Sequence, residues 1–114
     1  MSTDPVETNP DAYRVVFENE RVRVLEYADE PGHRSEPHSH PDSVMVTLSS
    51  FRRRLSRGDT SFETELPAGV AMWLPAQSHW GENIGDTGTR AIFVELLEPA
   101  PNAPDGPEPL GPSA

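Results

Sequence analysis

Proline and glycine divide this chain into short segments, and that division most constrains how it can fold. The 114 residues include 13 prolines and 8 glycines, and no long stretch between them shows a helical period. A proline inside a helix removes a backbone hydrogen bond and clashes with the preceding turn, so long helices are disfavoured. The sequence therefore predicts a protein built from short strands and turns.

Several segments have the composition and alternation of β-strands. In residues 21–27, charged side chains alternate with apolar ones, which is typical of a strand with one buried face. Turn-forming residues separate the segments. Many short strands at this spacing predict an antiparallel sandwich or barrel. The predicted strands are residues 13–18, 21–27, 44–51, 62–66, 71–74 and 89–97.

The two ends of the chain differ in composition from its middle. Residues 1–12 are polar and broken by proline, and residues 98–114 hold six of the thirteen prolines with few side chains that can pack. Such segments bury too little apolar surface to offset the entropy lost on ordering, so both are predicted to be flexible. Residues 13–97 are predicted to form one domain, whose small core favours a homodimer.

The charge of the chain limits its partners. Nine basic residues against nineteen acidic ones give a net charge of −10, which disfavours nucleic acid and anionic membranes. There is no cysteine, so neither a disulfide nor a thiolate metal ligand is possible. The first residues lack the basic start and apolar run of a signal peptide. These features predict a cytoplasmic protein whose partner is a small molecule.

Two histidines, His38 and His40, are separated by one residue. Side chains at positions i and i+2 project from the same face of an extended strand, whereas on a helix they diverge. Pro37 and Pro41 flank the pair and argue against a helix. His38 and His40 are therefore predicted to point the same way, and His79 is the candidate that completes a metal site with them.

Two spaced motifs around these histidines resemble those of the cupin superfamily. Residues 32–40 (glycine, five residues, His-x-His) resemble the start of the first cupin motif. Residues 69–83 (glycine, five residues, proline, then histidine, three residues, asparagine) resemble the second. The resemblance implies an all-β fold, the antiparallel cupin barrel also called the double-stranded β-helix or jelly roll. It also implies that His38, His40 and His79 are metal ligands.

Shorter stretches resemble a narrower group within that superfamily, the small one-domain cupins named as β-alanine degradation proteins. The two motifs are separated by a stretch whose sequence varies among cupins, here roughly residues 50–67. The stretches that carry the narrower resemblance are Arg-Val-Leu-Glu-Tyr at 23–27, His-Ser-His-Pro-Asp-Ser-Val-Met at 38–45 and Leu-Pro-Ala-Gln-Ser-His at 74–79.

The first motif lacks the carboxylate ligand that cupins usually have. They commonly place a glutamate four or five residues after the second histidine, where this chain has Val44 and Met45. Alignment by the following strand moves that position to Ser43, which is not a carboxylate either. The resemblance therefore implies a three-histidine centre without glutamate. Whether Ser43 or Asp42 replaces the missing ligand is left open.

Such a ligand set has chemical consequences. Neutral imidazoles leave the charge of a divalent ion uncompensated, and three protein ligands leave positions open for water, substrate or dioxygen. Resemblance to three-histidine cupins that use dioxygen favours Fe(II), with Zn, Ni, Mn or Cu as alternatives. Asp42 can orient a ligand imidazole, and Gln77 can hydrogen-bond a bound molecule beside His79, so both are candidate catalytic residues.

Three classes of function follow from this interpretation. The favoured one is a metal-dependent oxidoreductase that acts as a dioxygenase on a small molecule. The others are a non-catalytic metal-containing binding or sensor protein and a zinc-dependent hydrolase or isomerase. The fold alone does not decide between them.

Residues 52–54 are three consecutive arginines, and surface charges explain them better than an anion-binding site does. Alternation along a strand places Arg53 on the opposite face from its two neighbours, so the three do not form one patch. The run is predicted to be a set of solvent-facing charges that pair with the many acidic residues and protect a strand edge.

Overall fold

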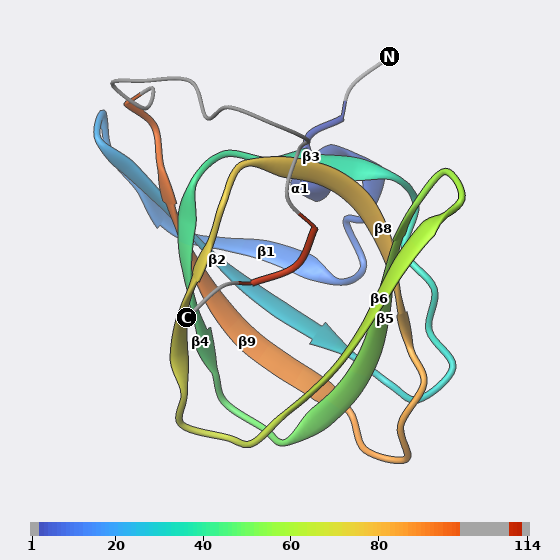
Figure 1. The fold of residues 1–114 in the computed structure, drawn as a ribbon. Coiled ribbons are helices and arrows are strands. Elements are labelled where there is room, and N and C mark those ends of the chain that lie inside the picture. The colour runs from blue at the N-terminus through green and yellow to red at the C-terminus, as the bar shows by residue number, and fades with distance from the viewer. Residues whose placement is uncertain (1–2, 99–109, 113–114) are drawn as a thin grey trace.

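The computed structural model describes residues 3–98 and 110–112, which form one short helix and nine strands. The strands make two antiparallel sheets that face each other across the core (Figure 1). The elements are α1 (Pro5–Thr8), β1 (Tyr13–Glu18), β2 (Val22–Asp29), β3 (His38–His40), β4 (Ser43–Thr47), β5 (Phe51–Arg57), β6 (Thr60–Leu66), β7 (Ala71–Leu74), β8 (Gln77–Asn83) and β9 (Thr89–Leu96).

The chain passes back and forth between the two sheets, as in a jelly roll. One sheet has the strand order β1-β2-β9-β4-β7 and the other has the order β3-β8-β5-β6. The predicted all-β antiparallel architecture is confirmed. Among the described residues the pairing of strands stops at the edges of each sheet, so the predicted barrel is a sandwich rather than a closed ring of hydrogen bonds.

Alternation along β9 sets the inner face of the larger sheet. Its first, third, fifth and seventh residues are buried, and the residues between them are exposed or half-buried. In the register of the sheet, Phe93 of β9 lies between Leu25 of β2 and Met45 of β4. These side chains meet in one apolar cluster, whose buried members are Ala12, Tyr13, Leu25, Tyr27, Met45, Leu74, Ala91 and Phe93.

Sequence patterns do not predict β8, although this strand lies inside the smaller sheet. Its buried positions hold Gln77, His79, Gly81 and Asn83. Strand prediction depends on hydrophobic alternation, and here the inward-facing positions are polar or glycine. Hydrophobic patterns therefore miss β8 because polar residues face inward from it, and one of these, His79, belongs to the candidate metal centre.

β5 separates the three consecutive arginines between two environments. Arg52 and Arg54 face outward and pair with Glu63 of β6 at 3.7 Å and 3.0 Å, as expected of surface charges. Arg53 points into the molecule and is 8% exposed. The prediction of solvent-facing charges is wrong for Arg53, because β5 pairs with β6 on one side and β8 on the other and its alternate face is the interior.

Residues before the first strand pack against the sheets. Asp4 caps α1 by accepting a hydrogen bond from the backbone N–H of Val6 at 2.9 Å. Asn9 exchanges hydrogen bonds with the backbone of Glu36, donating at 3.1 Å and accepting at 2.8 Å. At the other end of the chain, Gly111 is buried. The flexibility expected of residues 1–12 and 98–114 stays a prediction, and residues 99–109 lie outside the described part of the chain.

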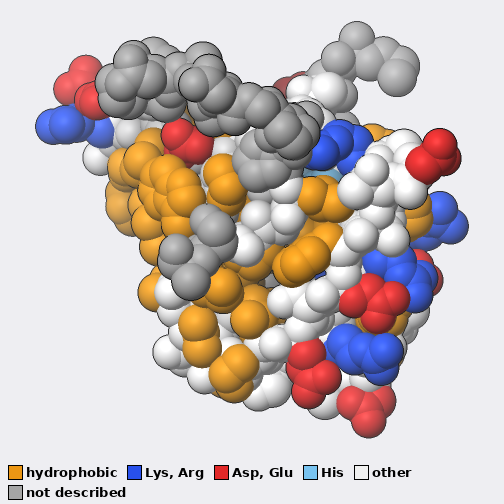
Figure 2. Space-filling view, viewed as in Figure 1, with side chains coloured by type: hydrophobic (Ala, Val, Ile, Leu, Met, Phe, Trp, Pro, Cys, Tyr) orange, Lys and Arg blue, Asp and Glu red, His pale blue; other side chains and the backbone are white. Residues whose placement is uncertain are grey.

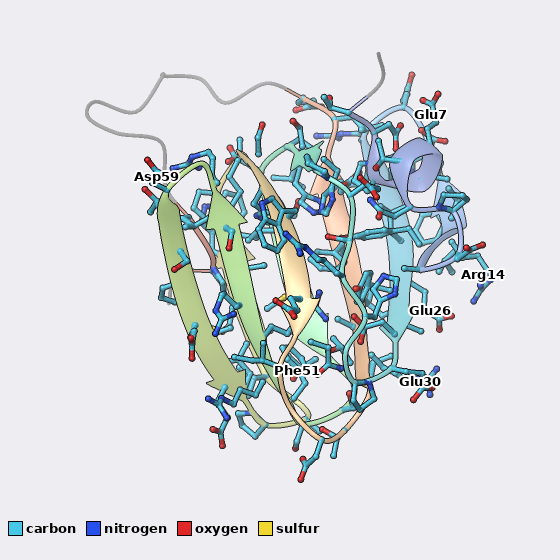
Figure 3. All side chains as sticks on the ribbon, turned by 90° about the vertical axis from the view of Figure 1, so that its right-hand side faces the viewer. Glu7, Arg14, Glu26, Glu30, Phe51 and Asp59 are labelled. Atoms are coloured by element: carbon cyan, nitrogen blue, oxygen red, sulfur yellow. The ribbon has the colours of Figure 1, made fainter. Side chains whose placement is uncertain are left out.

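Charged side chains cover much of the outside. Glu7, Arg14, Glu26 and Glu30 extend away from the ribbon (Figure 3). On the face shown in Figure 2, hydrophobic side chains gather on one side and charged ones on the other. Residues 15–17 of β1, at the edge of their sheet, are 38%, 45% and 53% exposed. An apolar edge suits a subunit contact, and the homodimer stays a prediction.

Within the described residues, α1 is much too short to cross a membrane, and no other helix is present that could do so.

Candidate metal centre

β3 and β8 bring the three predicted histidines together. His38 lies directly opposite His79 in the strand register, and His40 is two residues farther along the same face of β3. Their exposed fractions are 3% for His38, 6% for His79 and 3% for His40. Each offers one ring nitrogen, and these nitrogens all lie within 4.8 Å of one another. The group can therefore hold a metal ion.

Oxygen acceptors at Nδ1 fix the rings of His38 and His79. His38 Nδ1 lies 2.7 Å from the backbone carbonyl oxygen of Glu36, and His79 Nδ1 lies 2.8 Å from Oε1 of Gln77. The Gln77 amide is held in this orientation because its Nε2 donates to the carbonyl of Pro75 at 2.9 Å. A carbonyl oxygen only accepts, so Nδ1 of each imidazole carries the proton and Nε2 keeps its lone pair.

Asn9 reinforces the position of His38. Its side-chain nitrogen lies 3.3 Å from His38 Nδ1, but the two protons of that nitrogen have nearer acceptors, Thr8 Oγ1 at 2.8 Å and the Glu36 carbonyl at 3.1 Å. The shorter contact, from His38 to Glu36, therefore sets the tautomer. Asn9 holds the Glu36 backbone in place and so acts on the ring indirectly.

The third ring, that of His40, is oriented by a carboxylate that the sequence patterns did not identify. Oε2 of Glu95, on β9, lies 3.2 Å from His40 Nδ1, and both side chains are 1% exposed. The other carboxylate oxygen of Glu95 pairs with Arg23 at 2.8 Å, and Arg23 also contacts Asp4 at 2.9 Å. The carboxylate expected to orient a ligand imidazole was Asp42, and in the structure Glu95 has that position. In the sequence, Glu95 is a charged residue at one of the alternating positions that are buried in an otherwise apolar strand, and this could have pointed to it.

The structure also shows what Gln77, Asp42 and Ser43 contact near the site. Gln77 lies beside His79, as predicted, and contacts it directly. Asp42 Oδ1 accepts a hydrogen bond from the backbone N–H of Ala76 at 2.8 Å. The Ser43 hydroxyl donates to the carbonyl of Pro41 at 2.7 Å. Asp42 and Ser43 thus hold loop backbone, and Glu95 has the orienting place that was expected of Asp42.

Burial keeps the His38 and His79 rings neutral. Burial, with a contribution from the neighbouring His40, lowers the pKa of His38 to about 4. Burial and the two other histidines hold the pKa of His79 well below its usual value. Neutral imidazole is the form that binds a metal ion. At neutral pH both rings therefore present free lone pairs and need lose no proton before binding.

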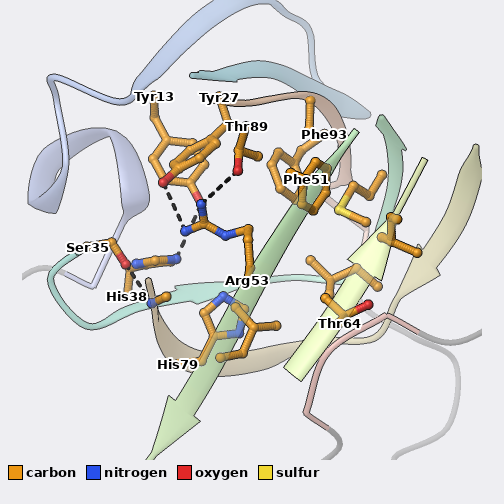
Figure 4. Close-up of a pocket in the computed structure, with 16 residues that line it drawn as sticks. Tyr13, Tyr27, Ser35, His38, Phe51, Arg53, Thr64, His79, Thr89 and Phe93 are labelled. Atoms are coloured by element: carbon orange, nitrogen blue, oxygen red, sulfur yellow. Dashed lines mark hydrogen bonds between the residues drawn. The ribbon is translucent and has the colours of Figure 1, made fainter. Parts of the chain in front are cut away.

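A cavity of about 50 Å³ adjoins the histidines and runs between the sheets (Figure 4). His38, His79, Tyr13 and Arg53 are among the polar side chains that line it. Most of the remaining wall is apolar. The apolar side chains that line it include Met45, Phe51, Leu55, Leu66, Leu74 and Phe93.

Arg53 anchors a second buried polar cluster. Its guanidinium donates to Thr89 Oγ1 and to Tyr27 Oη, each at 3.1 Å, and forms an ion pair with Asp29. Burial alone would raise the pKa of Asp29, but the Arg53 charge together with hydrogen bonds from Tyr27, Arg53 and Asn83 outweighs it and holds the pKa below its usual value. Gly81 leaves room for the guanidinium, because a Cβ there would lie 2.8 Å from Arg53 Nη2.

Strand order, motif positions and facing sheets together define the double-stranded β-helix of the cupin fold, and comparison with solved structures supports this. No protein-family model matches the sequence, and no curated protein matches it. The chain is similar to a cupin domain from Bordetella pertussis, with 29% identity over 74% of this chain and 90% of that one and a TM-score of 0.68.

Two further structures show the same fold. One is a protein with a double-stranded β-helix domain from Klebsiella pneumoniae, with 24% identity, 75% of each chain covered and a TM-score of 0.60. The other is the polyketide cyclase RemF from Streptomyces resistomycificus, with 20% identity, 78% of this chain and 66% of that one covered and a TM-score of 0.58. The predicted fold is confirmed.

Proposed function

We propose that this protein is a metal-dependent enzyme in which His38, His40 and His79 hold one divalent ion, with iron(II) favoured. The observation that carries the proposal is the tautomer of the three rings. Each Nδ1 has an oxygen acceptor, so each Nε2 keeps its lone pair. Burial and repulsion between neighbouring protonated rings disfavour a proton on His79. The three lone pairs, whose atoms lie within 4.8 Å of one another, can instead be satisfied by one metal ion.

The proposed histidine set has no carboxylate from the first motif. Ser43 is bonded to loop backbone, and Met45 lies in the apolar cluster. Glu95 touches His40 at Nδ1, the nitrogen turned away from a shared ion, and its charge is paired with Arg23. When bound, iron(II) would supply Lewis acidity and one-electron chemistry with dioxygen.

The cavity supports dioxygenase chemistry. It is small, lined mostly by apolar side chains and continuous with the histidines. Dioxygen is itself small and apolar, so a cavity of about 50 Å³ lined in this way can hold it, and the wall leaves room for only part of a very small organic substrate. A dioxygenase inserts both atoms of dioxygen into its product and so needs no external reductant. The substrate class that fits is a small, mainly apolar molecule with one group able to reach the histidine end.

Narrower assignments rest on this proposal. The resemblance to cupins named for β-alanine degradation, a homodimer and a cytoplasmic place are all consistent with it and are proposed with it. A zinc-dependent reaction such as hydrolysis or isomerisation, and a non-catalytic sensor role, are the alternatives. RemF, which is named as a polyketide cyclase, shows that this fold also serves chemistry of other kinds.

Elemental analysis of protein purified without oxygen tests the proposal. We expect close to one transition-metal ion per chain, iron rather than zinc, and almost none in the double variant His38→Ala, His40→Ala. His33→Ala, which removes the histidine outside the group, should keep the metal. The iron protein should consume dioxygen with a small carbonyl or thiol substrate, and the metal-stripped protein should not. Full metal content in the double variant would refute the site, and zinc in place of iron would refute the oxygenase.

A further inference from the structure

The hydroxyl of Tyr13 lies where two of the candidate ligands meet. Its oxygen is 3.3 Å from Nε2 of His38 and 3.3 Å from Nε2 of His40. Tyr13 is the first residue of β1 and is 5% exposed. In sequence Tyr13 is far from both cupin-like motifs. It lies next to their histidines because β1 belongs to one sheet, β3 and β8 belong to the other, and the two sheets face each other.

Proton counting shows that hydrogen bonding alone does not satisfy this arrangement. The Nδ1 atoms of His38 and His40 carry the ring protons, so both Nε2 atoms are acceptors. A phenol has one proton and can donate it to only one of them. The other contact then joins two atoms that both carry lone pairs. A cation between the three atoms would make both contacts favourable.

The other tyrosine of the chain shows what a satisfied hydroxyl looks like. Tyr27 pairs with Tyr13 across β1 and β2, and their rings pack edge to face with centroids 4.7 Å apart. The Tyr27 hydroxyl donates to Asp29 and accepts from Arg53. It thus has one donor partner and one acceptor partner. Tyr13 instead faces two bases.

Packing fixes the orientation of the Tyr13 side chain. Its ring also contacts His38 edge to face at 5.5 Å and Phe93 at 6.0 Å between centroids. Its backbone N–H donates to the carbonyl of Asn9 at 3.0 Å, and Asn9 is the residue that holds Glu36 near His38. The hydroxyl is therefore held toward the histidines from both its ring and its backbone.

The measured separations match those between ligands of one ion. Two atoms bound to a common metal at about 2.0–2.1 Å, at right-angle or tetrahedral positions, lie about 2.8–3.4 Å apart. Both contacts of the Tyr13 oxygen fall within that range at 3.3 Å. We infer that Tyr13 is the fourth protein ligand, binding the ion held by His38, His40 and His79 through its phenolate oxygen. This inference rests on the proposed metal centre.

Tyr13 then supplies the anionic ligand that the first motif lacks. On binding, the oxygen–metal bond replaces the O–H bond, and the phenolic proton passes to solvent. The formal charge of the centre falls from +2 to +1, as it does with a glutamate ligand. A metal ion that accepts six ligands keeps open positions for substrate and dioxygen beside the four protein ligands.

Ultraviolet difference spectroscopy during zinc titration of the metal-stripped protein tests this inference. A free phenol stays protonated at neutral pH, so absorption of ionised tyrosine that grows with zinc and disappears with a chelator reports a bound phenolate. The chain has only two tyrosines, which allows a matched pair of variants. We expect the signal in the wild type and in Tyr27→Phe, and none in Tyr13→Phe. We also expect Tyr13→Phe to bind zinc more than about 100-fold more weakly, beyond the 10–100-fold loss typical of an outer partner.

The outcomes separate this inference from the proposed function. Stoichiometric zinc binding to the wild type without the tyrosinate signal would overturn the role of Tyr13 and leave the three-histidine site standing. Persistence of the signal in Tyr13→Phe would overturn that role as well. Failure of the folded wild type to bind zinc at all would overturn both. Because the first readout uses the wild type, it does not depend on the stability of either variant.

Discussion

The interior of this protein holds two buried polar clusters that differ in how their charges are balanced. In the cluster around Arg53, a cation meets the anion Asp29, and the Tyr27 hydroxyl has both a donor and an acceptor partner. In the cluster around His38, His40 and His79, neutral bases turn their lone pairs inward. One cluster is complete within the protein alone, and the other is a group that can hold a cation.

This difference teaches that burial of polar residues is not by itself a sign of function. Arg53 is buried like the histidines, at 8% exposed, yet its hydrogen bonds stay within the protein. What distinguishes the histidine cluster is the direction of its protons. They point outward to Glu95, Gln77 and the Glu36 backbone, so that acceptors face each other. Three experiments test how far the two clusters can be treated separately.

Replacement of Arg53 should have the largest effect on stability. Arg53→Met leaves Asp29 buried without its cation, and breaking a buried ion pair costs about 3–5 kcal/mol. We expect urea unfolding to show this loss while metal content per folded chain stays unchanged. The control is Arg54→Met on the same strand, whose partners Glu63 and Glu82 are at the surface, with a cost below about 1 kcal/mol. Loss of metal from folded Arg53→Met would show that the clusters are coupled.

The two clusters should respond to acid in different pH ranges. The pKa of His38 falls from 6.5 in the unfolded chain to about 4 in the folded one, so the unfolded chain binds more protons between these values. The free energy of unfolding of the metal-stripped protein should therefore fall as pH drops from 6.5 toward 4, by roughly 3 kcal/mol for His38. His79 acts in the same direction. The lowered pKa of Asp29 means that its contribution is lost only below about pH 3.8.

Urea unfolding of metal-stripped protein at several pH values measures this dependence. His38→Gln should show a clearly smaller loss over the same range, because it removes the group that titrates. A wild-type free energy of unfolding that stays constant from neutral pH to pH 4 would contradict the assignment of neutral, buried rings.

The smallest expected effect comes from the residue that orients His40. Glu95→Gln keeps the shape of the side chain but removes the negative charge opposite Nδ1. An outer partner of this kind is typically worth 10–100-fold in metal affinity, or about 1.4–2.7 kcal/mol. Competition with a chelator of known affinity measures it. The control is Glu26→Gln, which changes an outward-facing carboxylate of β2 that pairs with Arg14 and should leave the metal affinity unchanged. Equal metal affinities in the two variants would show that Glu95 plays no part in the site.

Much of this arrangement could be predicted from local patterns. The spacing of His38 and His40, with prolines on both sides, indicated one strand face, and two motifs indicated the fold. Asn83, the last residue of the second motif, fixes the following hairpin by accepting from the N–H of Gly85 at 3.0 Å and donating to the carbonyl of Thr87 at 2.9 Å. These features depend on residues close in sequence, where spacing determines geometry.

The residues that sequence reasoning missed reach the site across the fold. Glu95 lies 55 positions from His40, and Tyr13 lies 25 positions from His38. Nothing in the local composition of β1 or β9 reveals which strand faces which. Arg53 was assigned to the surface because three arginines in a row resemble an exposed segment. Only the pairing of β5 on both sides turns the middle one inward.

Through hydrogen bonds, the Gln77 side chain links Gly111, near the C-terminus, to His79 of the candidate centre. The amide that accepts from His79 Nδ1 also accepts from the N–H of Gly111 at 2.7 Å and donates to the Gly111 carbonyl at 3.2 Å. At the other end of the chain, Asp4 completes the path through Arg23 and Glu95 to His40. Neither end is thus a neutral place to attach an affinity tag. The shortest chain able to build this centre extends beyond the strands that carry its histidines.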